Sequence, residues 1–364
     1  MAYVTGLLVI DAPASALNNA GPDAGARVDN SSAIKFVRTP QGSYPYVSAQ
    51  AVRYWLRESI AKKGGPWVAS PTYKESANLA YTAADPVEWW DDDLFGYMRA
   101  PDAGTKEERK KDPTFQRLTP LEEVKNRSGK LSEVTITRIS PLRIGTMVSI
   151  APVWITNDFG SMARHEGDPV LHGHQFYRAH LCCLFSLDLT GAGTFFDANK
   201  VGIKNLDSIR RKKAEDAGLA QAEVRGQTAF RLPIEKRQER VATLIRALAT
   251  LDGGAKLTLH YTDVAPSMIF AAVTQSGNHP FARVLTASDK HETELHVDAV
   301  KEMLDAYKAD FLSKIHVGWA KGFLDDQRKR LPEAEPLLPP VHPRNAIEEL
   351  AKELESKDHQ AWYA

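Results

Sequence analysis

The alternating segment at residues 176–189 constrains the fold of this chain more than any other feature. Every second residue from Tyr177 to Leu189 is apolar, whereas the positions between them include Arg178 and His180. Successive side chains of a β-strand point to opposite faces, so the pattern predicts a long strand with one buried and one semi-polar face. Folds that bind RNA offer such a sheet, but long antiparallel strands of many other folds share the pattern.

A helix is predicted at residues 48–62, where Pro45 keeps the approach extended and Ser48 can cap the first free N–H groups. Apolar residues recur at helical spacing on one face, at Val52, Trp55, Leu56 and Ile60. The other face carries Gln50, Arg53, Tyr54 and Arg57. An amide, two guanidinium groups and an aromatic ring suit phosphates and unstacked bases. A buried tryptophan face with a solvated back would have the same periodicity.

The remaining pattern predicts an α+β fold with an RNA-recognition-motif-like antiparallel sheet and helices on one face. Further strands are expected at residues 4–10, 33–38, 131–139, 142–150, 255–262 and 268–274, and further helices at 86–98, 233–251, 297–315 and 345–357. Composition divides the chain into two core parts (1–63 and 231–315), a helical or irregular insertion (64–130), core strands (131–195), a basic excursion (196–230), and a C-terminal connector with an acidic helix (316–364).

Overall charge does not identify a nucleic-acid-binding protein, because 46 basic residues balance 46 acidic ones. The charges are segregated, however, with a basic excess in residues 200–246 and an acidic excess in residues 331–364. This distribution suits one phosphate-binding surface, or two solvated helices of opposite sign. Adjacent Cys182 and Cys183 cannot easily form a disulfide, and no apolar segment approaches ~18 residues. We therefore expect a soluble protein of the reducing cytoplasm.

Candidate ligands for a sugar–phosphate chain also lie outside the helix. The loop at residues 17–30 has short side chains and glycines, which let a backbone approach a ligand closely. Other candidates lie at the strand junction of residues 138–143, on the semi-polar face of the long strand, and in the basic excursion. The set is Asn18, Asn19, Gly21, Lys35, Arg138, Ser140, Arg143, Arg178, Arg210, Arg211, Lys212 and Lys213.

Residues 44–57, with the strand at 4–10 and residues 16–21 and 30–35, closely resemble the DevR family of CRISPR-associated proteins. The match covers roughly the first sixth of the chain, with weaker similarity at 138–145, 176–189 and 266–281. That family supplies the repeated backbone ("Cas seven") subunit of type I Cascade complexes. The resemblance implies a hand-shaped subunit of subtype I-B, in which the basic excursion is a thumb over the guide RNA.

The function implied by the resemblance is non-catalytic. Several copies would polymerise along a CRISPR RNA and expose its bases for pairing with target DNA, so that base pairing supplies specificity. Phosphates would be bound by Lys35, Arg53, Arg57, Arg143 and residues 210–213, and hydrogen bonds that fix the register would come from Asn18, Asn19, Ser48 and Gln50. The implied partners are CRISPR RNA, the target DNA strand, further copies of the chain, other Cascade subunits, and a helicase-nuclease or transposition proteins.

Two other hypotheses remain open. The spacing of His165, Asp168, His172 and His174 permits metal ligation in a metal-dependent ribonuclease, but no recognised zinc spacing repeats. A free regulator of duplex DNA is the other hypothesis, for which the sequence has no helix-turn-helix signature. We expect neither a metal nor a cofactor, because phosphate-loop, dinucleotide and nucleophile-elbow motifs are absent.

Overall fold

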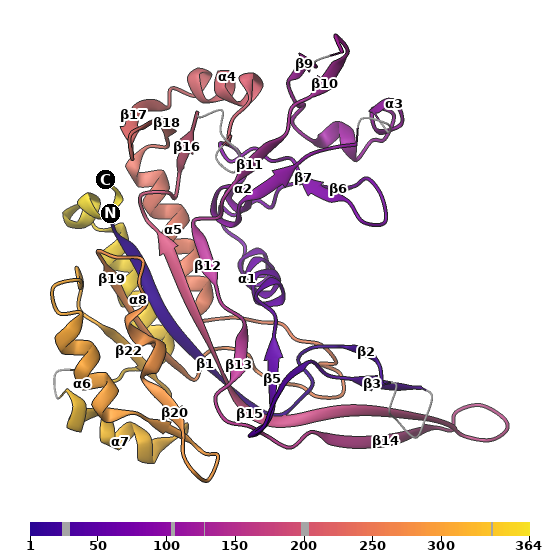
Figure 1. Ribbon diagram of the computed structural model, residues 1–364, viewed down its shortest axis with the longest axis vertical. Coiled ribbons are helices and arrows are strands. Elements are labelled where there is room, and N and C mark those ends of the chain that lie inside the picture. The colour runs from indigo at the N-terminus through magenta and orange to yellow at the C-terminus, as the bar shows by residue number, and fades with distance from the viewer. Residues whose placement is uncertain (24–29, 103–105, 127, 198–203, 336–337) are drawn as a thin grey trace.

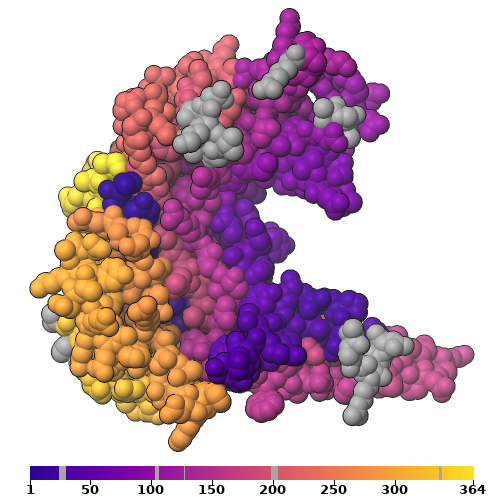
Figure 2. All heavy atoms as spheres, viewed as in Figure 1, coloured from indigo at the N-terminus to yellow at the C-terminus, as the bar shows by residue number. Residues whose placement is uncertain are grey.

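The computed structural model describes residues 1–23, 30–102, 106–126, 128–197, 204–335 and 338–364. Its helices and antiparallel sheets confirm the predicted α+β fold (Figure 1). The molecule is a crescent, in which two projections face each other across an open concave region (Figure 2). No helix in the described ranges is long and apolar enough to cross a membrane.

The main sheet is built around β15 (Val170–Asp188), which pairs antiparallel with β1 (Tyr3–Ser15). The predicted alternation is confirmed, because every second residue from Tyr177 to Leu189 is at most 4% exposed. The strand order across the sheet is β22 (His316–Trp319), β19 (Met268–Thr274), β1, β15, β13 (Met147–Ser149), β5 (Gly42–Val47) and β4 (Phe36–Thr39).

Three helices pack on the apolar face of β15, namely α1 (Ala49–Lys63), α5 (Ile234–Leu248) and α8 (Pro343–Glu355). Helix α1 forms as the sequence predicts. The Ser48 side chain accepts a hydrogen bond from the Ala51 amide at 3.4 Å and caps the helix. The four apolar residues of the predicted face are buried, with Trp55 and Leu56 at 4% and 0% exposure.

The opposite face of the sheet is also partly covered, by α6 (Val297–Ala306) and α7 (Asp325–Ala334). Leu7, Phe270 and Val300 belong to a second apolar core on this side. On the face that the sequence predicted as semi-polar, Ser186 and Asp188 are buried, and Cys182 and Leu184 are partly buried. Cys182 packs on this side and Cys183 in the first core, and both are free thiols, as expected.

Some sequence predictions of secondary structure were wrong. Residues 131–139 are split into β10 (Leu131–Glu133) and β11 (Ile136–Arg138), which pair with different strands. Residues 255–262 form turns instead of a strand, because the apolar side chains that suggested alternation are exposed, with Leu259 at 63% and Tyr261 at 79%. The helix predicted at 297–315 ends at Ala306.

The remaining elements are short. They are β2 (Gly21–Pro22), β3 (Ser31–Ala33), β6 (Thr72–Lys74), β7 (Ala80–Thr82), α2 (Trp90–Phe95), β8 (Tyr97–Arg99), α3 (Lys106–Arg109), β9 (Glu123–Lys125), β12 (Leu142–Ile144), β14 (Thr156–Met162), β16 (Thr194–Phe196), α4 (Ser208–Asp216), β17 (Ala220–Val224), β18 (Gln227–Arg231), β20 (Leu285–Ala287) and β21 (Thr293–Leu295).

Two segments form the projections of the crescent. The insertion lobe, residues 67–138, contains β6 to β11 with α2 and α3. The arm, residues 156–176, is a hairpin of β14 with the first part of β15, and β3 pairs with it near its base (Figure 1). The described part of the basic excursion predicted at 196–230 lies beyond one end of the main sheet (Figure 1). It folds as β16, β17, β18 and α4 around Phe195 and Phe230 and packs beside the insertion lobe.

We expect Gly253→Ala to lower the free energy of unfolding by about 1–3 kcal/mol, the usual cost of overpacking a core. A Cβ atom at Gly253 would lie 2.3 Å from the ring of Trp55, which is buried and cannot move aside freely. Chemical denaturation followed by circular dichroism measures the change. Gly277→Ala is the matched control, because its nearest neighbour would be 3.6 Å away. Equal losses for the two variants would contradict this packing.

Candidate nucleic-acid interface

The open region between the insertion lobe and the arm is a cleft with α1 at its back (Figures 1 and 2). Because the buried face of α1 is fixed on the sheet, its other face is directed away from the core. Gln50 and Tyr54 are exposed on that face, Tyr54 at 59%. An amide and an aromatic ring one helical turn apart can contact a base by stacking and by hydrogen bonding.

The two arginines of α1 both contact Phe95 of the insertion lobe. Arg53 donates to the carbonyl oxygens of Phe95 at 2.5 Å and Leu142 at 2.9 Å, and to the Ser140 hydroxyl at 3.1 Å. Burial, with a smaller effect of Arg57, lowers the pKa of Arg53 to about 10, so it remains a cation at neutral pH. The Arg57 guanidinium lies 4.1 Å from the Phe95 ring centroid. Arg53 therefore has little capacity left for a phosphate, whereas Arg57 makes no hydrogen bond with the described residues.

Several of the predicted residues gather at the N-terminus of α1, where the Asn18 side chain connects three segments. Its amide group donates to the carbonyl oxygens of Lys35 at 3.1 Å and of Tyr46, and its carbonyl oxygen accepts from the Lys35 amide at 2.6 Å. Asn18 is 7% exposed and so positions its neighbours. Asn19 is exposed and accepts from the Gly21 amide, whose φ of 95° favours glycine. Asn19 is thus exposed at this site, and Lys35 is half-buried.

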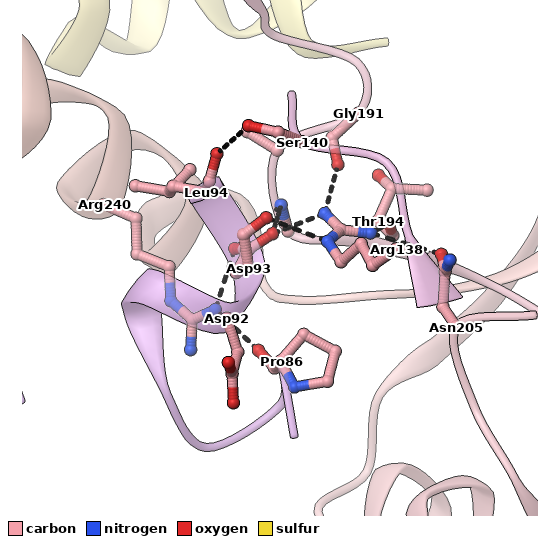
Figure 3. Close-up of polar contacts among 12 residues, drawn as sticks. Pro86, Asp92, Asp93, Leu94, Arg138, Ser140, Gly191, Thr194, Asn205 and Arg240 are labelled. Atoms are coloured by element: carbon pink, nitrogen blue, oxygen red, sulfur yellow. Dashed lines mark hydrogen bonds and ion pairs between the residues drawn. The ribbon is translucent and has the colours of Figure 1, made fainter. Parts of the chain in front are cut away.

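Asp93 of α2 binds two buried arginines, Arg138 at the end of the insertion lobe and Arg240 in the body (Figure 3). Its carboxylate accepts from Arg138 at 2.5 Å and from Arg240 of α5 at 2.8 Å. Arg138 also donates to three backbone carbonyl oxygens and to Asn205, so all five of its N–H groups are used. Arg138, predicted to bind RNA, is 5% exposed and holds the fold together instead.

The basic run at residues 210–213 is also largely committed to the protein. Arg210 is 0% exposed and donates to backbone carbonyl oxygens of the insertion lobe, so it is corrected from a phosphate ligand to a structural residue. Arg211 pairs with a carboxylate, and Lys213 pairs with Asp85 at 2.7 Å. Lys212 is exposed and makes no ion pair with any described residue.

Three further predicted residues are Arg178, Ser140 and Arg143, and Ser140 lies next to α1, where its hydroxyl accepts from Arg53. Arg178 lies on the face of β15 opposite α1, where it forms an ion pair with Asp11 and lies 3.3 Å from His180. Ser140 is half-buried, and its hydroxyl lies 2.9 Å from the Leu94 carbonyl oxygen. Arg143 of β12 is exposed, and its guanidinium makes no hydrogen bond with a described residue. Of these three residues, Arg143 alone remains available to a phosphate.

The histidines that suggested a metal site lie along the arm. The His165 ring contacts the Asp168 backbone carbonyl at 3.1 Å, and His174 lies 3.4 Å from Asp158 and against the ring of His260. Burial and the neighbouring His260 lower the pKa of His174. Within the described residues, no group of three or more His, Cys, Asp or Glu side chains is placed to hold a metal ion.

The arm carries exposed apolar residues that the sequence analysis did not select. They are Phe159, Met162, Val170 and Leu171, and Trp154 precedes the arm with 94% exposure. The sequence held a signal for Trp154, because it lies between Val153 and Ile155 in an extended segment. The arm itself was missed because its strands are rich in glycine, histidine and other polar residues.

No protein-family model matches the chain, and no curated protein sequence matches it. Among solved structures, a chain of a CRISPR RNA-guided surveillance complex is similar, with 12% identity and a TM-score of 0.49 over 96% of this chain and 98% of that chain. A chain of a pre-nicking CRISPR RNA-guided surveillance complex has 10% identity and a TM-score of 0.50 over 97% of this chain and 100% of that chain. The second likeness shows a shared fold over nearly the whole length of both chains.

We expect Asp93→Asn to lower the free energy of unfolding by about 3–5 kcal/mol, because it removes the counter-charge of two buried arginines. Denaturant unfolding measures the loss, and limited proteolysis detects release of the insertion lobe. Asp326→Asn is the matched control, since that side chain is 93% exposed and pairs with Lys329 on the surface. The control should change stability by less than about 1 kcal/mol. A fully stable Asp93→Asn variant would contradict the role of this junction.

Proposed function

We propose that this chain is an RNA-binding subunit of a type I CRISPR surveillance complex of subtype I-B. In this role, several copies bind side by side along one guide RNA and form the backbone of the complex. The observation that carries the proposal is the fold shared with a chain of a CRISPR RNA-guided surveillance complex over 97% of this chain and 100% of that one. The sequence resemblance of residues 4–57 to the DevR family supports it separately.

The cleft offers a chemically suitable path for a single strand. Tyr54 and Gln50 are exposed on α1, Arg57 keeps unbonded N–H groups, and Asn19 and Lys35 lie at the N-terminus of the same helix. Aromatic rings and amides bind unstacked bases, and cations bind phosphates. Because the chain has no net charge, these local contacts would supply the affinity. The protein would read the RNA backbone and shape, and pairing with target DNA would read the sequence.

The proposed role is non-catalytic, with the guide RNA, the target strand, further copies and the other subunits as partners. A helicase-nuclease or transposition proteins would then act on the bound target. The chain should be purified at low salt and tested for bound RNA in assemblies larger than a monomer. Nuclease-resistant RNA of uniform length is the expected result. A monomer that neither carries RNA nor binds added single-stranded RNA would refute the proposal.

The same preparation separates the two other hypotheses. Cleavage of labelled RNA that stops on addition of a chelator would favour a metal-dependent ribonuclease. Preference for duplex DNA in competition with single-stranded RNA would favour a regulator.

We expect Tyr54→Ala to weaken binding of single-stranded RNA by roughly 5- to 150-fold, the effect of losing one base–aromatic stack. Tyr54→Phe keeps the ring and should bind like the wild type. Fluorescence anisotropy with a labelled oligonucleotide measures both affinities. Since Tyr54 is mostly exposed, neither change should alter thermal unfolding. Equal affinity of all three proteins would remove α1 from the RNA path.

The salt dependence of RNA binding tests whether Arg143 contacts a phosphate. Arg143→Gln should reduce the slope of log affinity against log salt by about 0.7, the value for one phosphate contact to a single strand. Lys301→Gln, which removes an exposed cation of α6, should leave the slope unchanged. An unchanged slope for Arg143→Gln would place this arginine away from RNA.

A further inference from the structure

We propose that a cavity at the base of the arm binds one unstacked nucleobase of a single-stranded nucleic acid. The cavity, here called the base pocket, has a volume of about 360 Å³ and lies between the β4–β5 hairpin and the segment that leads into β14. This volume is in the usual range for small-ligand sites. None of the described residues that line it belongs to α1, so it is separate from the α1 face of the cleft. The inference rests on the proposed function, which supplies the strand.

Trp154 forms the exposed wall of the base pocket. The neighbouring residues fix the backbone and thereby the direction of its side chain. Residues 152–155 run extended beside the hairpin, and the Val153 amide donates to the Ser43 carbonyl oxygen at 2.8 Å. Val153 and Ile155 pack against the main core, so the side chain between them must point outward. Trp154 is 94% exposed, and its indole stacks on no other ring of the described chain. A large aromatic surface left in water is available to stack on a base.

The opposite wall supplies a cation beside a second aromatic ring. Phe36 and Arg38 lie two residues apart on β4, so they share one face of the strand. The Arg38 guanidinium lies 5.4 Å from the Phe36 ring centroid and has no ion-pair partner among the described residues. It can therefore bind the phosphate of the nucleotide whose base enters the pocket.

Amide groups complete the lining. Gln41, in the hairpin turn, and Asn157, on β14, have side-chain amides that make no hydrogen bond within the described chain. Gln175, opposite Asn157 in the arm, is occupied, because its amide oxygen accepts from Ile34 and its amide nitrogen donates to Asp23. Free amides can pair with the donor and acceptor groups on a base edge.

The charge of the lining distinguishes a nucleotide from a basic peptide. None of the described residues that line the base pocket is acidic, and Arg38 is their one permanent cation. A lysine- or arginine-rich segment would find no counter-charge there, whereas a nucleotide brings both a planar base and a negative phosphate. An aromatic ring, a cation and free amides in one cavity are the groups used to hold splayed bases of single strands.

The test uses the full chain and single-stranded RNA that carries 2-aminopurine, whose fluorescence falls when the base stacks on an aromatic ring. The wild type should quench this fluorescence. Trp154→Ala should quench it less and should bind the RNA roughly 5- to 150-fold more weakly. Trp154→Phe should restore most of both signals. Arg38→Ala should lower the salt slope by about 0.7, and Lys301→Ala should not. Because Trp154 is almost fully exposed, the variants should unfold like the wild type.

A second experiment replaces the oligonucleotide with free 2-aminopurine ribonucleotide. Quenching with both ligands supports a site for the base itself, and quenching with the oligonucleotide alone supports a site that needs the strand. Binding of RNA that is unchanged in Trp154→Ala would overturn the base pocket and leave the proposed function standing. No binding of RNA by the wild type would overturn both. Trp154-dependent binding of a peptide but not of RNA would assign the cavity to a protein partner and also overturn the inference.

Discussion

The carboxylate of Asp93 is the single group on which the arrangement of the crescent depends. It binds Arg138, at the far end of the insertion lobe, and Arg240 of α5 in the body, so one charge connects three segments that are distant in sequence. Its second oxygen also accepts from the Gly193 amide at 3.1 Å. Burial of a charge is tolerated only when partners and hydrogen bonds replace the lost water, and here they do so. The position of the lobe over the cleft follows from this junction.

The structural use of buried arginines also explains why arginine content was a poor guide to the candidate interface. Five arginines donate to backbone carbonyl oxygens at places where irregular segments meet the body. They are Arg53, Arg138, Arg210, Arg237 and Arg240. Five N–H donors on a planar group suit loops that leave several carbonyls unpaired. A sequence shows the charge of such residues but not their burial. The arginines that look most like RNA ligands in the sequence can therefore be those that close the fold.

The sequence predicted secondary structure best where apolar residues repeat at a short, regular spacing. The alternation of β15 and the helical spacing of α1 specified both elements and their buried faces, because each pattern repeats within a few residues. The predicted RNA-recognition-like detail of the sheet and the RNA contacts remain predictions. The arm, the second apolar core and the base pocket could not be foreseen, because each depends on pairing between distant segments. Val153 beside Ser43 is one such pairing, separated by more of the chain than any local pattern spans.

The continuity of β15 from the core into the arm has a mechanical consequence. One unbroken strand pairs first with β14 and β3 and then with β1 and β12, so its outer and inner parts share a single hydrogen-bonded backbone. An arm built this way behaves as a lever fixed in the central sheet, and it cannot swing like a tethered loop. Whatever the arm meets, its direction is set before contact. Little orientational entropy is then lost when the arm meets a partner.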